Sequence, residues 1–484
     1  MLRTPSQPRP GRSGADGASA SGTVHGRRLS PLDGSFLRLE SPHSHMHVGF
    51  SAVFAAPSGR ARPSVEALRE RAAGRLHEVP WCRWRLDPAP LGLSEPRWVD
   101  DVRFDLTAHI VALTPPDDRV SYASFEALRS TVLSAPLDRA RPLWQIFLVP
   151  QLEDGRVGMI GKIHHALVDG LAALQIVSLI LDAESDAASQ PPLAWQPHER
   201  LGWPLDTVSR TFADAIGALQ AAATAAAHPP MSVANAARAA KQLLGAAAEE
   251  VLSPAPPSAL NRPIGARRTL VGYHAGRDEL RAARRAGGTL NDVGLAAVAG
   301  AVRALLQHDG ERPTQPLKAM VPVSMRRLGD TAAGNQISMI TIALPVHLGS
   351  ASERLRWVRE QTGRLKQQDR PDGTHKLYQA AGLLPAPLRS PAAKAMATAR
   401  QFNLTVSQSP APRGSLFLLG CELEEVYSVV PITAGHPLAI GMVRYRQELF
   451  FGCYADPDAL PQVHRLPALI EAELRELGRA ATRA

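Results

Sequence analysis

A long alanine-rich stretch divides this 484-residue chain into two halves, and the division constrains the fold more than any other feature. Prolines bound the stretch at both ends, at Pro191 and Pro192 and again between Pro254 and Pro257, and alanine is its main apolar residue. Alanine buries too little apolar surface to build a core of its own. Residues 189–262 are therefore predicted to form a helical crossover linker between two larger lobes.

Strand and helix patterns alternate on both sides of this linker. Residues 145–149 and 157–163 have the pattern of two buried strands, and helical periodicity follows from Leu171. In the second half, residues 352–366 have the pattern of an amphipathic helix, and residues 438–454 that of a hairpin. The alternation predicts an α/β protein.

The predicted lobes are residues 29–188 at the N-terminal side and residues 263–484 at the C-terminal side. Residues 1–28 differ from both, because they hold five arginines, one aspartate, many Gly, Ser and Pro residues, and no apolar stretch. Such a segment cannot bury enough apolar surface to fold and lacks the apolar region of a secretory signal. It is predicted to be a disordered basic tail.

Charge and cysteine content restrict the compartment and the partners. The net charge is +9, and only six of the 54 cationic side chains are lysine. Three scattered cysteines without a C-x-x-C pair favour a reducing compartment, and no apolar run reaches the roughly 18–20 residues that span a bilayer. We expect a cytoplasmic protein with affinity for phosphate-bearing cofactors or acidic lipid surfaces, and not for nucleic acid.

The motif His164-His165-Ala166-Leu167-Val168-Asp169-Gly170, at a predicted strand-to-helix junction, carries the strongest chemical signal. A neutral imidazole can take a proton from an alcohol near pH 7, so general-base catalysis is the functional interpretation. The structural alternative is that His164 packs at the strand end and Asp169 caps the next helix. A metal site is disfavoured, because adjacent histidines point to opposite faces of a strand. Gly170 permits close approach of the backbone where the helix begins.

His43, His45 and His47 alternate along another predicted strand. Alternating residues share one face of a strand, so these three have the spacing of metal ligands. A strand-end feature without a metal is the favoured interpretation.

The H-H-x-x-x-D-G motif and its surroundings resemble the CoA-dependent acyltransferase superfamily, and within it the bacterial wax ester synthase/diacylglycerol acyltransferase family. The similarity runs from Leu29 to about Pro461. The segments that carry it are Leu29–Asp33, Met46–Gly49, Pro136–Arg139, Pro142-Leu143-Trp144, Asn261–Gly265, Asn291–Ala296 and Val321–Arg326.

The resemblance implies two lobes, each a mixed sheet with flanking helices, and an active-site tunnel at their interface. It implies transfer of a fatty acyl group from acyl-CoA, a co-substrate, to diacylglycerol or a long-chain alcohol, with no cofactor and no metal. By position it makes His165 the general base and His164 its neighbour. It makes Asp169 the residue that holds the loop through an ion pair with an arginine that the sequence does not identify.

The resemblance also indicates residues that bind substrate or support the site. Pro142, Leu143 and Trp144 are expected near an acyl pocket, although a buried core position for Trp144 is equally compatible with the sequence. Asn291 and Asp292 are expected to support the site, to cap a helix, or to do both.

Two departures from the family pattern point to the acceptor side. The usual N-V-P-G-P turn keeps only its asparagine, Asn403, and Gly294 stands where a bulky apolar residue is usual. Both positions are expected to line or support the acceptor side, so the resemblance indicates the chemistry more firmly than the acceptor.

Two other functions remain compatible with the sequence. One is acyl transfer from a carrier-protein-bound donor, as in condensation chemistry, and the other is a non-catalytic protein that coats lipid droplets or membranes. If the chain is the acyltransferase that the resemblance implies, its acceptor diacylglycerol resides in membranes. Peripheral attachment to the inner face of the membrane or to lipid droplets is therefore expected, with each tail cation contributing about 1 kcal/mol near an anionic leaflet.

Overall fold

The computed structural model describes residues 27–88, 96–168, 173–197, 254–324, 337–367, 401–409 and 414–483. Three of the predicted features lie wholly or largely outside these ranges. They are the tail up to residue 26, most of the 189–262 linker, and the pair Asp169 and Gly170.

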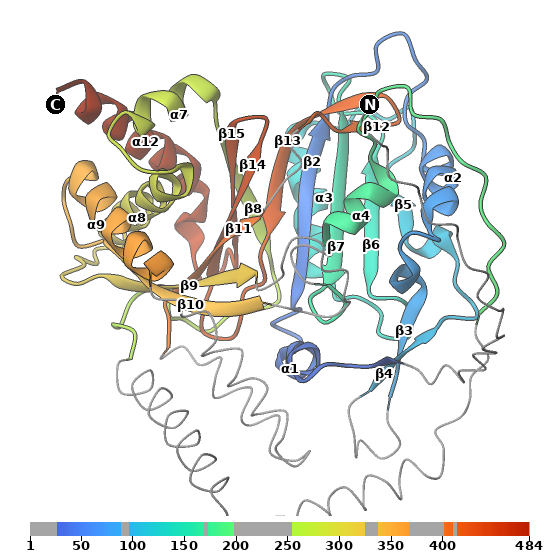
Figure 1. Ribbon diagram of the computed structural model, residues 1–484, viewed down its shortest axis with the longest axis horizontal. Helices are drawn as coiled ribbons and strands as arrows, with labels where there is room; N and C mark the ends of the chain where they lie inside the picture. Colours follow the sequence, from blue (N-terminus) through green and yellow to red (C-terminus); the bar gives the residue numbers. More distant parts are fainter. Residues whose placement is uncertain are drawn as a thin grey trace, which may run out of the picture.

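Two mixed sheets form the centre of the described structure, one in each lobe (Figure 1). The strands of the first sheet are β2 (His47–Phe54), β5 (Ile110–Ala112), β6 (Trp144–Val149), β7 (Val157–His164), β12 (Phe417–Leu418) and β13 (Cys421–Val429). The strands of the second sheet are β8 (Thr269–Ala275), β9 (Leu317–Ser324), β10 (Ile337–Leu344), β11 (Leu404–Ser409), β14 (Leu438–Tyr445) and β15 (Glu448–Ala455).

The strand orders are β12-β13-β2-β7-β6-β5 in the first sheet and β10-β9-β11-β14-β15-β8 in the second. Both sheets mix directions, because β5 runs parallel to β6, and β11 runs parallel to β9 and β14, whereas the other pairs are antiparallel. The predicted two-lobed α/β fold is confirmed, and so is the predicted hairpin, which is β14 and β15.

The second half of the chain also contributes to the first sheet. β13 pairs antiparallel with β2, with Tyr427 opposite Ser51, and a bulge interrupts the register between Leu423 and Glu425. Figure 1 shows β12 and β13 leaving the second lobe and lying along the edge of the first. The bounds 29–188 and 263–484 imply that each lobe is one continuous segment. The pairing of β13 with β2 instead places part of the second segment in the sheet of the first lobe.

A small third sheet, of strand order β1-β4-β3, lies at the start of the described chain. Its strands are β1 (Arg27–Arg28), β3 (Trp84–Asp87) and β4 (Arg97–Asp100). Arg27 pairs with Trp98 and Arg28 with Arg97, and the Arg27 guanidinium lies 5.9 Å from the centroid of the Trp84 ring. The predicted disordered tail is thus too long by its last two residues, because β4 satisfies their backbone groups.

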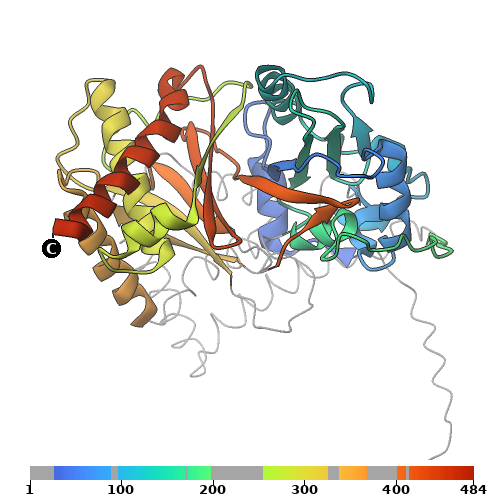
Figure 2. The same ribbon diagram turned by 90° about the horizontal axis from the view of Figure 1, so that it is seen from above.

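Within the described ranges, helices flank both sheets. Those of the first lobe are α1 (Pro31–Leu39), α2 (Val65–Arg75), α3 (Tyr122–Ser134) and α4 (Ala173–Ile180), with short 3-10 turns η1 (Pro80–Arg83) and η3 (Leu106–Ala108). Those of the second are α7 (Arg277–Arg284), α8 (Leu290–His308), α9 (Ala351–Gln367) and α12 (Leu466–Arg483), preceded by η4 (Pro461–Arg465). The helices of the second lobe lie on the side of its sheet that faces away from the first lobe (Figures 1 and 2).

The lobes meet through a shared apolar cluster. It joins Val53 and Phe125 of the first lobe to Leu270 and Tyr454 of the second. α3 packs against both β7 and β8, and the Arg129 guanidinium on α3 donates a hydrogen bond to the Leu270 carbonyl at 2.6 Å. This interface fixes the position of the central strands β2 and β7, on which the histidine motifs lie.

Within the described ranges, no helix is both long enough and apolar enough to cross a membrane.

Candidate active site

The two adjacent histidines lie at the end of β7 and are fixed through their backbones. His164 is the last residue of the strand, and its N–H donates to the Leu143 carbonyl at 2.9 Å. The His165 N–H donates to the Met46 carbonyl, also at 2.9 Å. The residues preceding β6 and β2 therefore hold the histidine pair from two sides.

Met46 itself has an unusual backbone conformation. Its φ of 50° lies in the left-handed region, and its side chain is buried. A non-glycine residue in this region costs of order 1–3 kcal/mol and persists where the surroundings require it. The conformation turns the chain so that the Met46 carbonyl meets His165 and His47 enters β2.

The His165 ring is oriented by an aromatic neighbour. Its centroid lies 4.0 Å from that of Phe36, and the two rings are within 7° of parallel. Phe36 belongs to α1, which begins with a capping box between Ser30 and Asp33. His165 as a whole residue is 9% exposed. The stacking on Phe36 fixes the plane of its ring.

His164, in contrast, is fully buried. Its Nδ1 accepts a hydrogen bond from the Ala166 N–H at 3.0 Å, and its carbonyl accepts one from the Leu167 N–H at 2.9 Å. Burial lowers the pKa of His164, and the nearby Glu40 carboxylate opposes that shift only in part. His164 is thus neutral near pH 7 and bonds within the turn that carries His165.

Glu40 and Arg139, which the sequence did not indicate as site residues, complete this arrangement. Glu40 Oε2 lies 3.6 Å from His164 Nε2, and the Arg139 Nε donates to the same oxygen at 2.6 Å. Burial tends to raise the pKa of Glu40, but the contacts with His164 and Arg139 outweigh it, so the pKa is lowered. Arg139 ends the Pro136–Arg139 segment, the one sequence signal that pointed to this region.

Other buried imidazoles lie beside His164. His47 is its cross-strand partner, with ring centroids 6.4 Å apart, and the His45 ring lies 5.4 Å from that of His47. Burial lowers the pKa of His47 well below its ordinary value, helped by the charge of Lys162. The His45 Nε2 donates to the Pro42 carbonyl at 3.1 Å. Over the part of the chain that the structure describes, no group of three or more His, Cys, Asp or Glu side chains is arranged to hold a metal ion.

Lys162 is buried on the same strand as His164. Its Nζ donates to the carbonyls of Val132 at 3.0 Å and Ala135 at 2.9 Å, at the end of α3. Burial lowers its pKa to about 8. The lysine joins β7 to the helix at the lobe interface.

Pro142, Leu143 and Trp144 are all buried, and the segment acts through its backbone. The Trp144 Nε1 donates to the Cys82 carbonyl at 2.7 Å, and its ring stacks on His109 at 4.6 Å between centroids. Trp144 belongs to the core of the first lobe. Of the two positions expected for Trp144, the structure places it in the core.

Asn291 and Asp292 lie in the second lobe at the start of α8. The Asp292 carboxylate accepts hydrogen bonds from the Thr289 N–H and hydroxyl, both at 2.8 Å, and one from the Thr362 hydroxyl on α9 at 2.8 Å. Asn291 is half-buried. The helix cap is therefore observed, whereas a role of Asn291 and Asp292 in the site stays a prediction.

The two departures from the family pattern occupy packed positions. The Asn403 side chain is fully buried and donates to Asn261 Oδ1 at 2.6 Å and to the Pro256 carbonyl at 2.7 Å. A Cβ at Gly294 would lie 2.7 Å from the Met442 sulfur. Both positions stabilise the second lobe from within, a role that their sequence context did not reveal.

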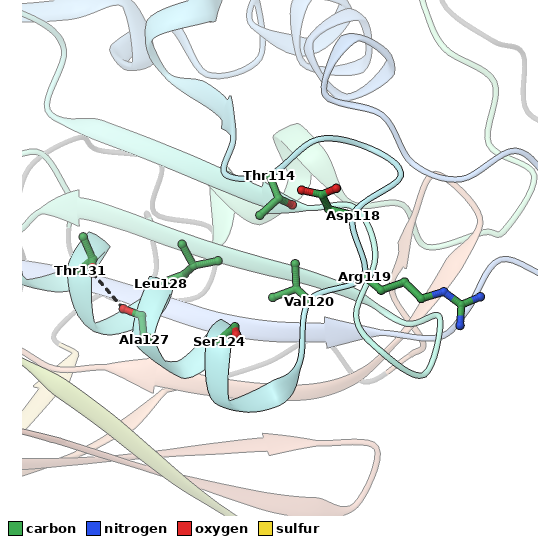
Figure 3. A pocket seen from close by; sticks show the side chains of 8 residues that line it. All are labelled: Thr114, Asp118, Arg119, Val120, Ser124, Ala127, Leu128 and Thr131. Carbon is green, nitrogen blue, oxygen red and sulfur yellow. Dashed lines mark hydrogen bonds between the residues drawn. The ribbon is translucent and has the colours of Figure 1, made fainter.

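The described residues form one hollow on the first lobe and another between the two lobes. One, of about 490 Å³, lies between α3 and the loop before it, with Asp118 and Arg119 on the loop side and Thr131 on the helix (Figure 3). The other, of about 420 Å³, is lined by residues 41, 43 and 44 of the first lobe and by 261–264 and 434–435 of the second. The predicted site residues that the structure describes line neither hollow, so the tunnel stays a prediction.

Comparison with known proteins agrees with this architecture. The profile of the wax ester synthase/diacylglycerol acyltransferase catalytic domain matches residues 29–294, and that of the WS/DGAT C-terminal domain matches residues 333–478. A probable diacylglycerol O-acyltransferase of Mycobacterium tuberculosis is 30% identical over 461 residues, which cover 93% of this chain and 99% of that protein. A second probable diacylglycerol O-acyltransferase from the same organism is 30% identical over 463 residues, which cover 93% of this chain and 95% of that protein.

Solved structures share the fold over nearly the full length. The wax ester synthase/diacylglycerol acyltransferase from Marinobacter aquaeolei VT8 matches with a TM-score of 0.68 and 26% identity, over 94% of this chain and 100% of that one. The first condensation domain of the calcium-dependent antibiotic synthetase matches with a TM-score of 0.57 and 16% identity over 95% and 97%, a likeness of fold alone. The two profile matches and the near full-length identity show that this chain belongs to the wax ester synthase/diacylglycerol acyltransferase family of acyltransferase enzymes.

Proposed function

We propose that the chain transfers a fatty acyl group from acyl-CoA to the hydroxyl of diacylglycerol, or of a long-chain alcohol, with His165 as the general base. The placement of His165 is the observation that carries the proposal. Its backbone is hydrogen-bonded to Met46, its ring is stacked on Phe36, and it keeps a small accessible area. A general base needs a fixed orientation toward the proton that it takes, which these contacts supply.

In the proposed reaction, the imidazole of His165 takes the proton of the acceptor hydroxyl as its oxygen attacks the thioester carbonyl. The carbon–sulfur bond of the tetrahedral intermediate then breaks, and the imidazolium of His165 returns the proton to the CoA thiolate. The products are an ester and free CoA. No covalent acyl-enzyme is needed, because the acceptor oxygen is itself the nucleophile.

His164 does not suit the role of base. Its Nδ1 lone pair is engaged by the Ala166 N–H, and its ring is fully buried against Glu40. We assign His164 a positioning role instead. Asp169 is proposed to hold the loop after His165, and exchanging it for asparagine should lower both activity and melting temperature.

A transfer assay with radiolabelled acyl-CoA tests the proposal. Label should enter triacylglycerol when diacylglycerol is supplied, or wax ester when a long-chain alcohol is supplied. Label that passes only from a carrier-protein-bound acyl group would instead support the condensation-like alternative. No transfer from either donor would support a non-catalytic coat protein.

We further propose that the chain acts at a lipid surface to which it attaches peripherally, either the inner face of the membrane or a lipid droplet. Diacylglycerol resides in lipid, and Arg3, Arg9 and Arg12 supply cations in the basic N-terminal segment. Exchanging all three for glutamine should weaken binding to vesicles that contain phosphatidylglycerol, and added salt should weaken it further.

A matched control for this experiment exchanges three exposed arginines elsewhere, Arg267, Arg281 and Arg475, for glutamine. Both variants lose the same formal charge, so only a specific role of the N-terminal segment separates them. Equal vesicle binding by the two variants would contradict that role. Turnover on detergent-dispersed substrate should be unchanged in both.

A further inference from the structure

We infer that Glu40 and Arg139 are positioning residues that act on the general base through His164. Arg139 holds the Glu40 carboxylate in place, and the carboxylate keeps the His164 proton on Nε2. His164 Nδ1 therefore has a lone pair, which accepts the hydrogen bond from the N–H of Ala166, the residue after His165. The inference rests on the proposed roles of His165 and His164 and adds Glu40 and Arg139 to them.

The first link joins Arg139, in the loop that precedes β6, to Glu40. The Arg139 Nε donates to Glu40 Oε2 at 2.6 Å, its Nη2 donates to the same oxygen, and Nη2 also donates to the Leu37 carbonyl at 2.9 Å. Glu40 follows α1 directly as its C-cap residue. The Glu40 side chain is 10% exposed and that of Arg139 is 51% exposed, so the carboxylate is buried beneath a guanidinium that reaches the surface.

The second link follows from the hydrogen-bonding chemistry of His164. A backbone N–H can only donate, so the bond of 3.0 Å from Ala166 requires a lone pair on His164 Nδ1. Burial keeps the ring neutral by lowering its pKa, so its single proton is on Nε2. That nitrogen faces Glu40 Oε2 at 3.6 Å, which is longer than a hydrogen bond and makes the contact electrostatic. A negative charge at this distance favours the proton on Nε2 over the proton on Nδ1.

The third link carries the effect to His165. The N–H of Ala166, the next residue, donates to the His164 ring, and the N–H of His165 itself donates to the Met46 carbonyl. If the His164 proton moved to Nδ1, two N–H groups would face each other and the turn would have to shift. A displacement of about 1 Å at a reacting group costs on the order of 100-fold in rate.

Kinetics of the full-length enzyme test the chain of contacts. Glu40→Gln removes the charge, and Arg139→Gln removes its support. Each should lower kcat by roughly 10- to 100-fold, while KM for acyl-CoA stays within about twofold, because positioning of the base affects the chemical step. The matched control is Arg141→Gln, which removes another arginine of the same loop from an exposed pair with Asp138 and should leave kcat unchanged.

The double variant Glu40→Gln/Arg139→Gln shows whether the two residues act through one series of contacts or independently of each other. If the residues act in series, the double variant should be no slower than the slower single variant. The inference would be overturned if the fold decrease in kcat of the double variant were the product of the two single decreases. It would also be overturned if both single variants had the same kcat as the parent enzyme. Should Glu40→Gln fail to fold, Arg139→Gln tests the same chain from its half-exposed end.

A spectroscopic measurement tests the proton position without using activity. In the full-length protein with ¹⁵N-labelled histidine, the ring nitrogens of His164 should show the Nε2–H tautomer, and in Glu40→Leu the Nδ1–H tautomer should become detectable. An Nδ1–H tautomer in the parent protein would overturn the inference, and so would an unchanged ring in Glu40→Leu. Parallel assays of the parent and His165→Ala enzymes test the proposed function itself, so failure of one hypothesis is distinguishable from failure of the other.

Discussion

The backbone carbonyl of Leu143 accepts the N–H of His164 at 2.9 Å, so the segment that begins β6 directly fixes the end of β7. The next side chain in that segment, Trp144, donates to the Cys82 carbonyl at 2.7 Å and fills the core of the lobe. The Pro-Leu-Trp segment thus contributes to the site through its main chain and to stability through its indole.

Trp144→Phe should destabilise the fold without changing acyl-chain preference. The variant leaves the buried Cys82 carbonyl without its donor, at a cost of about 1–3 kcal/mol. Denaturant unfolding gives the stability, and competition between acyl-CoA chain lengths gives the preference. Trp357→Phe serves as control, since the Trp357 indole makes a longer bond of 3.2 Å and is only partly buried. A changed chain-length profile in Trp144→Phe would show that this indole contacts the acyl chain.

Asn403→Ala should unfold at lower denaturant concentration while keeping the acceptor preference of the parent. Its side chain bonds Asn261, the Pro256 carbonyl and the Lys318 N–H, and each buried partner left unsatisfied costs about 1–3 kcal/mol. Acceptor preference is measured as the ratio of triacylglycerol to wax ester from mixed acceptors. A shifted ratio with unchanged stability would show that Asn403 contributes to the acceptor site, as the sequence indicated.

Gly294→Leu should lower the melting temperature through overpacking against β14, at about 1–3 kcal/mol. The contact at fault is the Met442 sulfur, 2.7 Å from the position of a Cβ. Met442→Ala should therefore restore part of the stability in the double variant, whereas alone it should destabilise. Additive losses in the double variant would disprove the contact.

Stability should fall as the pH decreases from about 6.5 toward 4. Burial lowers the pKa of His436 to about 4, and its Nε2 donates to the Phe402 carbonyl at 3.0 Å. Because the unfolded chain binds a proton on His436 in this range and the folded chain does not, the contribution of His436 to stability is full above pH 6.5 and decreases below it by up to about 1.4 kcal/mol per pH unit. The buried His47 and His164 act in the same direction. His436→Gln should therefore make the slope smaller without abolishing it, measured by denaturant unfolding at several pH values, whereas His464→Gln at an exposed position should leave the slope unchanged.

Local patterns allowed much of the fold to be predicted from the sequence. The strand before His164, the hairpin of β14 and β15 and the helix that starts after Thr289 all depend on neighbouring residues, and the structure contains each of them. The pairing of β13 with β2 did not follow from any local pattern, because it joins residues 369 to 380 positions apart.

The candidate site shows the same limit. The motif at His164 and His165 is continuous in sequence and could be recognised, whereas Glu40 and Arg139 are separated by 99 positions and meet only in the fold. Phe36 was missed because an aromatic residue in an amphipathic helix is ordinarily a core residue. Trp144 shows the converse, since a residue in a recognisable motif fills the core.

The most direct test of the account is the turnover of His165→Ala with acyl-CoA and diacylglycerol, measured beside its melting temperature. Loss of the general base should reduce kcat by roughly 10²–10⁴-fold, while the melting temperature stays close to that of the parent, since the His165 backbone bond to Met46 is retained. Full turnover by a folded His165→Ala enzyme would contradict the proposed mechanism.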